Sequence, residues 1–244
     1  MSSEISIIIP TLNEENSLKR TLNNLTLLDP PPKEIIVVDG GSQDNTLNIA
    51  RQADVSLLIS KQAGRSIQMN LGAKAAAGDI LCFLHADTLV PDDLMVVIEK
   101  TLKNPDLAGG GFISLMNGQQ HTRWGVSLHN YLKTYYAPLI FRPHLFFKGL
   151  RILFGDQVIF CRRSDFWHCG GYDEKLSIME DADICIKLLP YGRICLVNRI
   201  VQSSDRRVAK WGFLKANIIY LFIGCLWGVG VSATYLKQFY NEIR

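Results

Sequence analysis

Residues 5–15 read ISIIIPTLNEE, and residues 34–46 read EIIVVDGGSQDNT. Each stretch is a short, β-branched apolar run that stops at polar and turn-forming residues. Such continuous apolar runs are typical of strands that are buried on both faces of a sheet. A helical spacing of leucines follows the first run, and a helix with Asp44 or Ser42 as its N-cap is expected after the second. The two stretches therefore predict a repeated strand–helix unit.

The same alternation continues to about residue 105. We expect strands at Ile5–Ile9, Glu34–Val38, Val55–Ser60 and Ile80–Leu84, and helices at 18–25 and Ser66–Ala77. Alternating elements with continuous apolar strands predict an α/β fold with a mostly parallel sheet that helices cover on both faces. Further strands at Phe112–Leu115 and Val158–Cys161 and a helix at Asp181–Leu189 are expected in the looser second half.

Composition narrows the class of protein. The 244 residues are 48% hydrophobic and 20% charged, which is ordinary for a globular protein, and the net charge of +3 is too small to indicate nucleic-acid binding. The six cysteines form no C-x-x-C pair, so we expect buried free thiols in a reducing compartment. The polar first residues run straight into a strand, which predicts no signal peptide and a cytoplasmic protein.

Polar residues gather where three of the expected strands end. Thr11, Asp39 and Asp87 each follow one of these strands, and ligands bind beyond the carboxyl ends of parallel strands. Each residue alone fits a helix cap or a turn, but together they predict a site. An aspartate can accept the N–H of a uracil-like base, and a second carboxylate can hold a divalent ion against two phosphates. His85 can contact the metal, the ribose or a phosphate, or it can be a turn histidine.

Several motifs in order resemble glycosyltransferase family 2. They are Ile7–Glu15, Ile35–Thr46, Gly64-Arg65, His85-Ala86-Asp87, Gly155-Asp156-Gln157, Gly170-Gly171-Tyr172 and Met179-Glu180-Asp181. The resemblance implies the GT-A fold, with a catalytic domain at 1–206 that divides into a donor half (1–105) and an acceptor half (106–206). Residues 207–244 would form an apolar or amphipathic helical segment. With the Ser204–Arg207 motif added, the set resembles a small bacterial subgroup labelled as arsenosugar-biosynthesis glycosyltransferases.

The resemblance also implies roles for individual residues. Asp181 would be the general base, with Glu180 as the second candidate, and Asp87 would ligate Mn²⁺ or Mg²⁺ at the donor diphosphate. The residues that would bind the nucleotide sugar are Thr11, Asn13, Glu14, Asp39, Gly41, Ser42, Arg65, His85, Asp156, Gln157, Arg206 and Arg207. His85 stands where the family usually has the first carboxylate of Asp-x-Asp.

The implied function is an inverting, metal-assisted transfer of a sugar from a nucleotide-diphosphate sugar, with UDP-sugars favoured, to a hydroxyl of a small-molecule or lipid-linked acceptor. The alternative is a non-catalytic nucleotide-sugar binder with a degenerate site. A dinucleotide-dependent oxidoreductase would need G-x-G-x-x-G after the first strand, which is absent. A nucleotidyltransferase would normally have a glycine-rich phosphate loop with a basic residue near the N-terminus, and the chain shows none.

Simpler roles remain open for several of these residues. Asp181 can belong to a charged helix N-terminus, and Asp156 with Gln157 can form a turn before a strand. Arg206 and Arg207 can clamp a diphosphate or an anionic acceptor, or form a solvated basic turn.

The sequence leaves membrane association open. Ala216–Leu236 has no charged residue, is flanked by lysines and contains Gly224-x-x-x-Gly228, which would suit close helix packing in lipid. The segment can span a bilayer, lie at the interface or pack on the domain. The aromatic and basic stretch 121–153 can dock on an anionic membrane, at the inner face of the plasma membrane, or form an acceptor-binding lid. The oligomeric state has no sequence signal.

Overall fold

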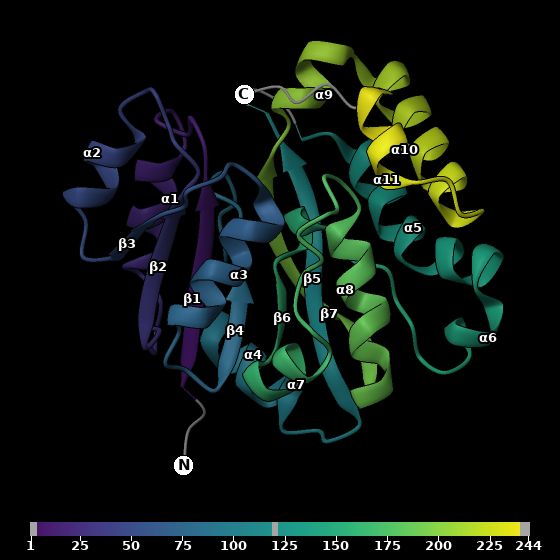
Figure 1. The fold of residues 1–244 in the computed structure, drawn as a ribbon, viewed down its shortest axis with the longest axis horizontal. Helices are drawn as coiled ribbons and strands as arrows, with labels where there is room; N and C mark the ends of the chain where they lie inside the picture. Colours follow the sequence, from purple (N-terminus) through teal and green to yellow (C-terminus); the bar gives the residue numbers. More distant parts are fainter. Residues whose placement is uncertain (1–3, 119–121, 240–244) are drawn as a thin grey trace.

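A mixed seven-stranded sheet runs through the protein (Figure 1). The structure is a computed structural model, and it describes residues 4–118 and 122–239. The strand order is β3-β2-β1-β4-β6-β5-β7. The strands are β1 (Ile5–Thr11), β2 (Glu34–Asp39), β3 (Ser56–Ile59), β4 (Ile80–Phe83), β5 (Leu107–Asn117), β6 (Ile159–Arg162) and β7 (Arg193–Ser204). Strands β3, β2, β1 and β4 are parallel, and β6 runs antiparallel to both β4 and β5.

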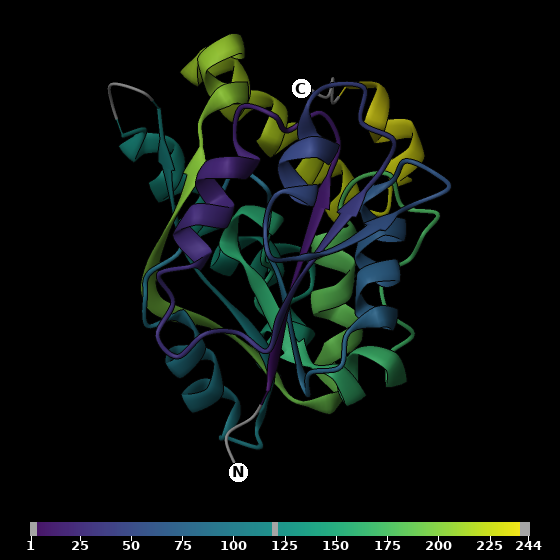
Figure 2. The same cartoon turned by 90° about the vertical axis from the view of Figure 1, so that its left-hand side faces the viewer.

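Helices cover both faces of the sheet, as the sequence predicts (Figure 2). One apolar core joins the sheet to α1 (Leu18–Leu25) and α4 (Leu94–Leu102). A second core on the opposite face joins it to α3 (Arg65–Ala75), α7 (Arg163–His168) and α8 (Glu180–Leu188). The remaining helices are α2 (Thr46–Arg51), α5 (Trp124–Phe141), α6 (Pro143–Phe146), α9 (Arg206–Trp211), α10 (Phe213–Gly228) and α11 (Ala233–Leu236). Three short 3₁₀ turns lie at Gly155–Gln157, Leu189–Tyr191 and Lys237–Phe239.

The α/β fold and the expected strands are confirmed, with differences at β5, at β7 and at the start of α2. The glycine run 109–111 lies inside β5 instead of preceding it, because the strand needs small residues there. A Cβ on Gly109 would lie 2.7 Å from the Phe160 carbonyl oxygen, and one on Gly110 would lie 2.8 Å from Cys195 Sγ. Strand β7, which pairs with β5 along its length, was not expected. The N-cap of α2 is Asn45, not Asp44 or Ser42.

The uncharged segment Ala216–Leu236 does not form one continuous helix. Helix α10 ends at Gly228, and Gly230 then takes a φ of +97°, which glycine adopts without steric cost. The N–H groups of Gly230 and Val231 donate to carbonyls in the last turn of α10, which closes the helix before α11. No helix in the ranges 4–118 and 122–239 is long and apolar enough to cross a membrane.

The aromatic and basic stretch becomes a helical wall beside the sheet. Helix α5 packs against α10, and the two lie side by side beyond the strands (Figure 1). His129 links them, because its Nδ1 lies 2.6 Å from Asn217 Oδ1 and its Nε2 lies 2.7 Å from the Tyr136 hydroxyl on its own helix. This wall faces the carboxyl ends of β1 and β4 and encloses the space above them.

Candidate active site

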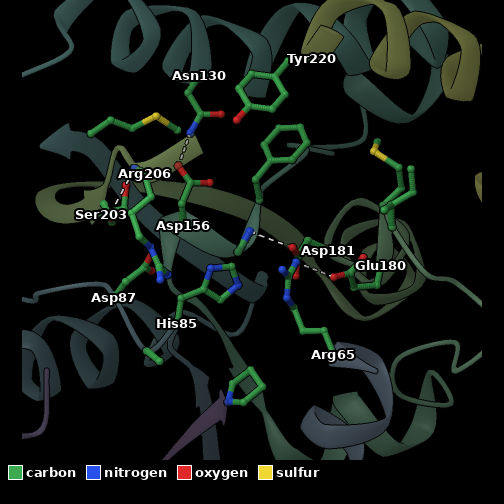
Figure 3. Close-up of a pocket in the computed structure, with 18 of the residues that line it drawn as sticks. Arg65, His85, Asp87, Asn130, Asp156, Glu180, Asp181, Ser203, Arg206 and Tyr220 are labelled. Atoms are coloured by element: carbon green, nitrogen blue, oxygen red, sulfur yellow. Dashed lines mark hydrogen bonds and ion pairs between the residues drawn. The ribbon is translucent and has the colours of Figure 1, made fainter. Parts of the chain in front are cut away.

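A cavity of about 250 Å³ opens above the carboxyl ends of β1 and β4 (Figure 3). It is lined by the turns after β1 and β4, the starts of α8 and α9, the 3₁₀ turn Gly155–Gln157, and the inner faces of α5 and α10. The expected site residues that line it are Thr11, Glu14, Arg65, His85, Asp87, Asp156, Glu180, Asp181 and Arg206. Segments that are up to about two hundred residues apart in the chain thus meet in one cavity.

Asp39 organises the loops below this cavity and is completely buried. Its Oδ1 accepts hydrogen bonds from the Gly41 and Ser42 N–H groups at 2.9 and 2.8 Å, and its Oδ2 accepts from the Thr11 and Ser42 hydroxyls at 3.1 and 2.5 Å. The Asn13 N–H in turn donates to Ser42 Oγ at 2.8 Å. In this structure these residues tie the turn after β1 to the turn after β2, and the nucleoside contacts expected of them stay a prediction.

Arg206 joins two carboxylates at one side of the cavity. Its Nη2 lies 2.8 Å from Asp87 Oδ2 and 2.9 Å from Glu14 Oε2, so the start of α9 is tied to the turns after β4 and β1. The guanidinium group is about one-third exposed and faces the cavity. Arg207 also belongs to α9, but its side chain lies outside the described residues.

The opposite side holds a buried acidic pair at the start of α8. Asp181 and Glu180 are both largely buried, and Arg65 Nη1 lies 2.9 Å from Glu180 Oε1. Asp181 Oδ2 accepts the Gly155 N–H at 2.9 Å. Burial, reinforced by the negative charge of Glu180, raises the pKa of Asp181 to about 8, although Arg65 opposes the shift. A carboxylate with its pKa near neutrality is suited to proton transfer.

Gly155 is required where His85 and Asp181 approach each other. A Cβ there would lie 2.1 Å from His85 Nε2 and 2.9 Å from Asp181 Oδ2. His85 thus stands between the Asp87 side and the Asp181 side of the cavity, as Figure 3 shows. Gln157 supports the same turn from below, since its side chain accepts the Phe154 N–H at 2.9 Å and donates to Thr134 Oγ1 at 3.2 Å.

Unusual backbone conformations mark the turns of the site. Among the described residues that are not glycine, a positive φ occurs at Asn13, Val158 and Met179, with values of 55°, 53° and 66°. They lie in the turn after β1, directly after the 3₁₀ turn of Asp156, and directly before Glu180. Such conformations cost about 1–3 kcal/mol each and gather at functional sites, which supports a functional role for this cavity.

The helical wall adds residues that the sequence interpretation did not assign to the site. Asn130 Nδ2 donates to Asp156 Oδ2 at 2.6 Å, and the Lys133 ammonium lies 3.6 Å from the centre of the Phe154 ring. Burial lowers the pKa of Lys133 to about 8, with Asp156 opposing the shift, and burial raises the pKa of Asp156. Tyr220 of α10 completes this side of the cavity. For Asn130 and Lys133 the only signal was the aromatic and basic composition of 121–153.

The side chains around Asp87 determine which kind of metal site the protein can form. No group of three or more His, Cys, Asp or Glu side chains able to hold a metal occurs within residues 4–118 and 122–239. Asp87 instead offers one carboxylate at the edge of the cavity. Mg²⁺ is often held by one or two carboxylates together with substrate phosphates. The residues present therefore fit a metal that binds with a donor diphosphate, and do not form a complete cage.

The family follows from a comparison with known sequences. The sequence model described as glycosyl transferase family 2 matches residues 6–168, which include β1 to β6 and the turns that carry Asp39 and Asp87. The chain belongs to glycosyltransferase family 2. Its fold, with the mostly parallel sheet and the cavity at the strand ends, is the GT-A fold that the resemblance implied.

This family 2 glycosyltransferase has related sequences over different lengths. Poly-beta-1,6-N-acetyl-D-glucosamine synthase of Staphylococcus epidermidis is 33% identical over 42% of the chain but only 26% of its own length. Undecaprenyl-phosphate 4-deoxy-4-formamido-L-arabinose transferase of Edwardsiella ictaluri is 21% identical over 98% of the chain and 90% of its own length. The narrower arsenosugar resemblance has no support among these relatives and stays a prediction.

Solved structures share the fold at low sequence identity. A mannosyltransferase from Pyrobaculum calidifontis, solved with GDP-Man and Mn²⁺, aligns over 100% of the chain and 66% of its own, with a TM-score of 0.71 and 18% identity. Glucosyl-3-phosphoglycerate synthase from Mycobacterium tuberculosis, solved with Mn²⁺, UDP and glucosyl-3-phosphoglycerate, covers 94% and 81%, with a TM-score of 0.62 and 20% identity. At these identities the likeness concerns the fold.

Proposed function

We propose that this family 2 glycosyltransferase moves a sugar from a nucleotide-diphosphate sugar, preferentially a UDP-sugar, to an acceptor hydroxyl with inversion at the anomeric carbon. The observation that carries the proposal is the position of Asp181. This buried carboxylate lines the same cavity as the acidic turn at Asp87. In a single displacement, the base would deprotonate the attacking acceptor hydroxyl, and the turn at Asp87 would hold the departing diphosphate on the other side.

The donor would lie across the strand ends of the first 105 residues. Thr11, Glu14 and Asp39 would hold the nucleoside, with Asn13, Gly41 and Ser42 shaping that pocket through their hydrogen bonds. Arg65 would lie near the base or phosphates. Arg206 and Arg207 would clamp the diphosphate, because guanidinium groups match phosphate oxygens in geometry and charge.

Asp87 would hold Mn²⁺ or Mg²⁺ jointly with the donor phosphates. When bound, the ion would neutralise the charge that develops on the departing diphosphate. Because the Arg206 guanidinium contacts Asp87, we expect it to lie close enough to contact the phosphates as well. The acceptor half, residues 106–206, would supply Asp156 and Gln157 for sugar or acceptor hydroxyls.

Asp181 would act as the general base, with Glu180 kept in its ion pair with Arg65. In its ionised form, the Asp181 carboxylate takes the proton of the acceptor hydroxyl while that oxygen forms a bond to the anomeric carbon. The bond from the anomeric carbon to the diphosphate oxygen breaks, and its electron pair leaves with the nucleoside diphosphate. The Gly155 N–H fixes one carboxylate oxygen, which holds the other available towards the cavity.

Release of nucleoside diphosphate from a panel of UDP-, GDP- and dTDP-sugars tests the proposal. We expect slow, metal-dependent hydrolysis of one donor that EDTA, Asp87→Ala and Asp181→Asn each abolish. Asp183→Asn is the matched control, because this partly exposed residue of α8 pairs with Lys187 at 3.1 Å and does not line the cavity. Tight, metal-indifferent donor binding without turnover would identify a degenerate binder, and no binding of any donor would overturn the donor assignment.

A further inference from the structure

A second, almost wholly apolar groove lies between α5 and α10. Apolar side chains line it, among them Tyr136 and Phe141 of α5, Leu221, Cys225 and Trp227 of α10, and Ile152 of the segment that follows α6. Figure 1 shows the two helices side by side, with α5 next to β5 and α10 further out at the edge of the molecule. Apolar grooves of this kind suit hydrocarbon far better than they suit a sugar, whose hydroxyls would lose hydrogen bonds to water there.

The groove is continuous with the candidate active site. Five residues line both spaces: Lys133, Phe154, Met179, Tyr220 and Gly224. The junction is open at Gly224, where a Cβ would meet no atom within 4 Å. Met179 directly precedes Glu180 and Asp181, so the groove begins beside the proposed base. A molecule with its reactive end at Asp181 can therefore extend along the groove.

The charges of the groove have one sign. Lys133 lies at the junction with the active site, and Arg142 stacks at 5.7 Å over the Trp227 ring further along. No aspartate or glutamate is found among the described residues that line the groove. Asp156 lies near Lys133 in the adjoining cavity, so the two cations and this one carboxylate leave an excess of positive charge along the groove and its junction, which favours an anionic group on the ligand.

The outer faces of the same two helices carry exposed apolar side chains. On α5 these include Trp124, Leu128 and Leu132, and on α10 they include Leu214 and Ile218, with exposed fractions from 48% to 71%. Their spacing of four residues places them in a stripe along each helix. Contiguous exposed apolar surface is uncommon on soluble proteins and marks contact with lipid or with another apolar partner.

We propose that the acceptor is an anionic amphiphile. Its hydroxyl-bearing head lies beside Asp181, its anionic group lies near Lys133, and its hydrocarbon chain fills the groove between α5 and α10. The inference rests on the proposed transferase function and specifies its acceptor. The exposed stripes on α5 and α10 would meet the lipid surface from which such an acceptor is drawn.

Calorimetric titration with octyl phosphate and butyl phosphate tests the groove directly. We expect octyl phosphate to bind at least tenfold more tightly, which corresponds to about 1.4 kcal/mol, or the burial of about two methylene groups. Two variants fill the groove from opposite helices, Cys225→Trp and Ala137→Trp, and each is expected to remove the preference for the longer chain. Ile218→Trp is the control, because it adds the same side chain to α10 at an exposed position outside the groove.

Titration of UDP with Mn²⁺ into the same variants separates this inference from the proposed function. If the wild type binds UDP but binds octyl phosphate no more tightly than butyl phosphate, the acceptor inference is overturned and the proposed function is not. A chain-length preference that both groove-filling variants keep also overturns it. A chain-length preference without UDP binding supports the groove and counts against the proposed donor. A dimer in solution that excludes octyl phosphate would assign the face to a second copy of the chain and overturn the inference.

Discussion

Asp181 has a different environment from Asp183, which lies on the same helix. It lies at the first turn of α8, is almost completely buried, and accepts a backbone hydrogen bond from Gly155. If residues 179–183 were only a charged helix start, their carboxylates would be exposed to solvent. Asp183 is partly exposed and pairs with Lys187 one turn later. Burial of a carboxylate costs free energy, and a fold retains such a cost most often where the group has a chemical role.

The raised pKa of Asp181 leads to a prediction about stability and pH. Burial and the Glu180 charge raise the pKa from 3.8 to about 8, so the native protein keeps a proton that the unfolded chain releases. The contribution of Asp181 to the free energy of unfolding therefore falls as the pH rises from about 4 to about 8. We expect Asp181→Asn to unfold at a higher temperature than the wild type, by a margin that grows between pH 5 and pH 8.

Asp181→Asn should also lower the rate of sugar transfer by about a thousandfold, since it removes the base. Thermal unfolding across this pH range, with Asp183→Asn as the control that follows the wild type, checks the stability part. If the difference in unfolding temperature between Asp181→Asn and the wild type does not change with pH, Asp181 is not protonated in the folded protein near neutrality.

At the scale of elements, the two glycines of α10 differ in their surroundings. The spacing Gly224-x-x-x-Gly228 indicated close packing in lipid, but the structure gives each glycine its own reason. A Cβ on Gly228 would lie 2.4 Å from the Phe141 ring, so Gly228 lets α10 approach α5. Gly224 faces open space at the junction of the cavity and the groove.

This difference predicts opposite effects of one substitution at two positions. Gly228→Ala should destabilise the protein by about 1–3 kcal/mol, because the new methyl overpacks the α5–α10 contact. Gly224→Ala should stabilise it by up to about 1 kcal/mol, because alanine has the higher helix propensity and meets no neighbour. Denaturant unfolding of the two variants checks this pair. Equal stability of both would show that α10 does not pack on α5 through Gly228.

Elements were predictable to different degrees. The strands of the first half were expected because β-branched runs bounded by turn residues carry a local signal. Strand β7 was not, because its sequence mixes charged and apolar residues and its pairing with β5 is a long-range choice. The break in the uncharged C-terminal segment was also missed, although Gly230 was visible, since hydropathy alone does not show where a helix folds back.

At the scale of the molecule, the site is built from segments that lie far apart in the sequence. The central strands β1 and β4 bring the turns of Thr11 and Asp87 together, and α9 returns after β7 to place Arg206 between Glu14 and Asp87. Because a ligand across these segments would bind only the folded protein, it should stabilise the whole fold.

UDP with Mn²⁺ is therefore expected to raise the unfolding temperature. At a concentration of about one hundred times Kd, the gain is about 2.7 kcal/mol, or roughly 5–10 °C for a chain of this length. Differential scanning fluorimetry measures the shift, and EDTA or Asp87→Ala should remove most of it. A shift of the same size in EDTA would contradict the metal role assigned to Asp87.

The sequence alone determined the parallel α/β core, the family, and the segments at the strand ends, because each depends on local patterns and on ordered motifs. Only the tertiary structure decided how those segments meet. It showed the Asp39 carboxylate fully engaged in joining two turns, Arg206 placed on Asp87, and the α5–α10 wall with Asn130, Lys133 and Tyr220 facing the cavity. These contacts join residues far apart in the chain, and no local pattern specifies which side chains burial and packing will bring together.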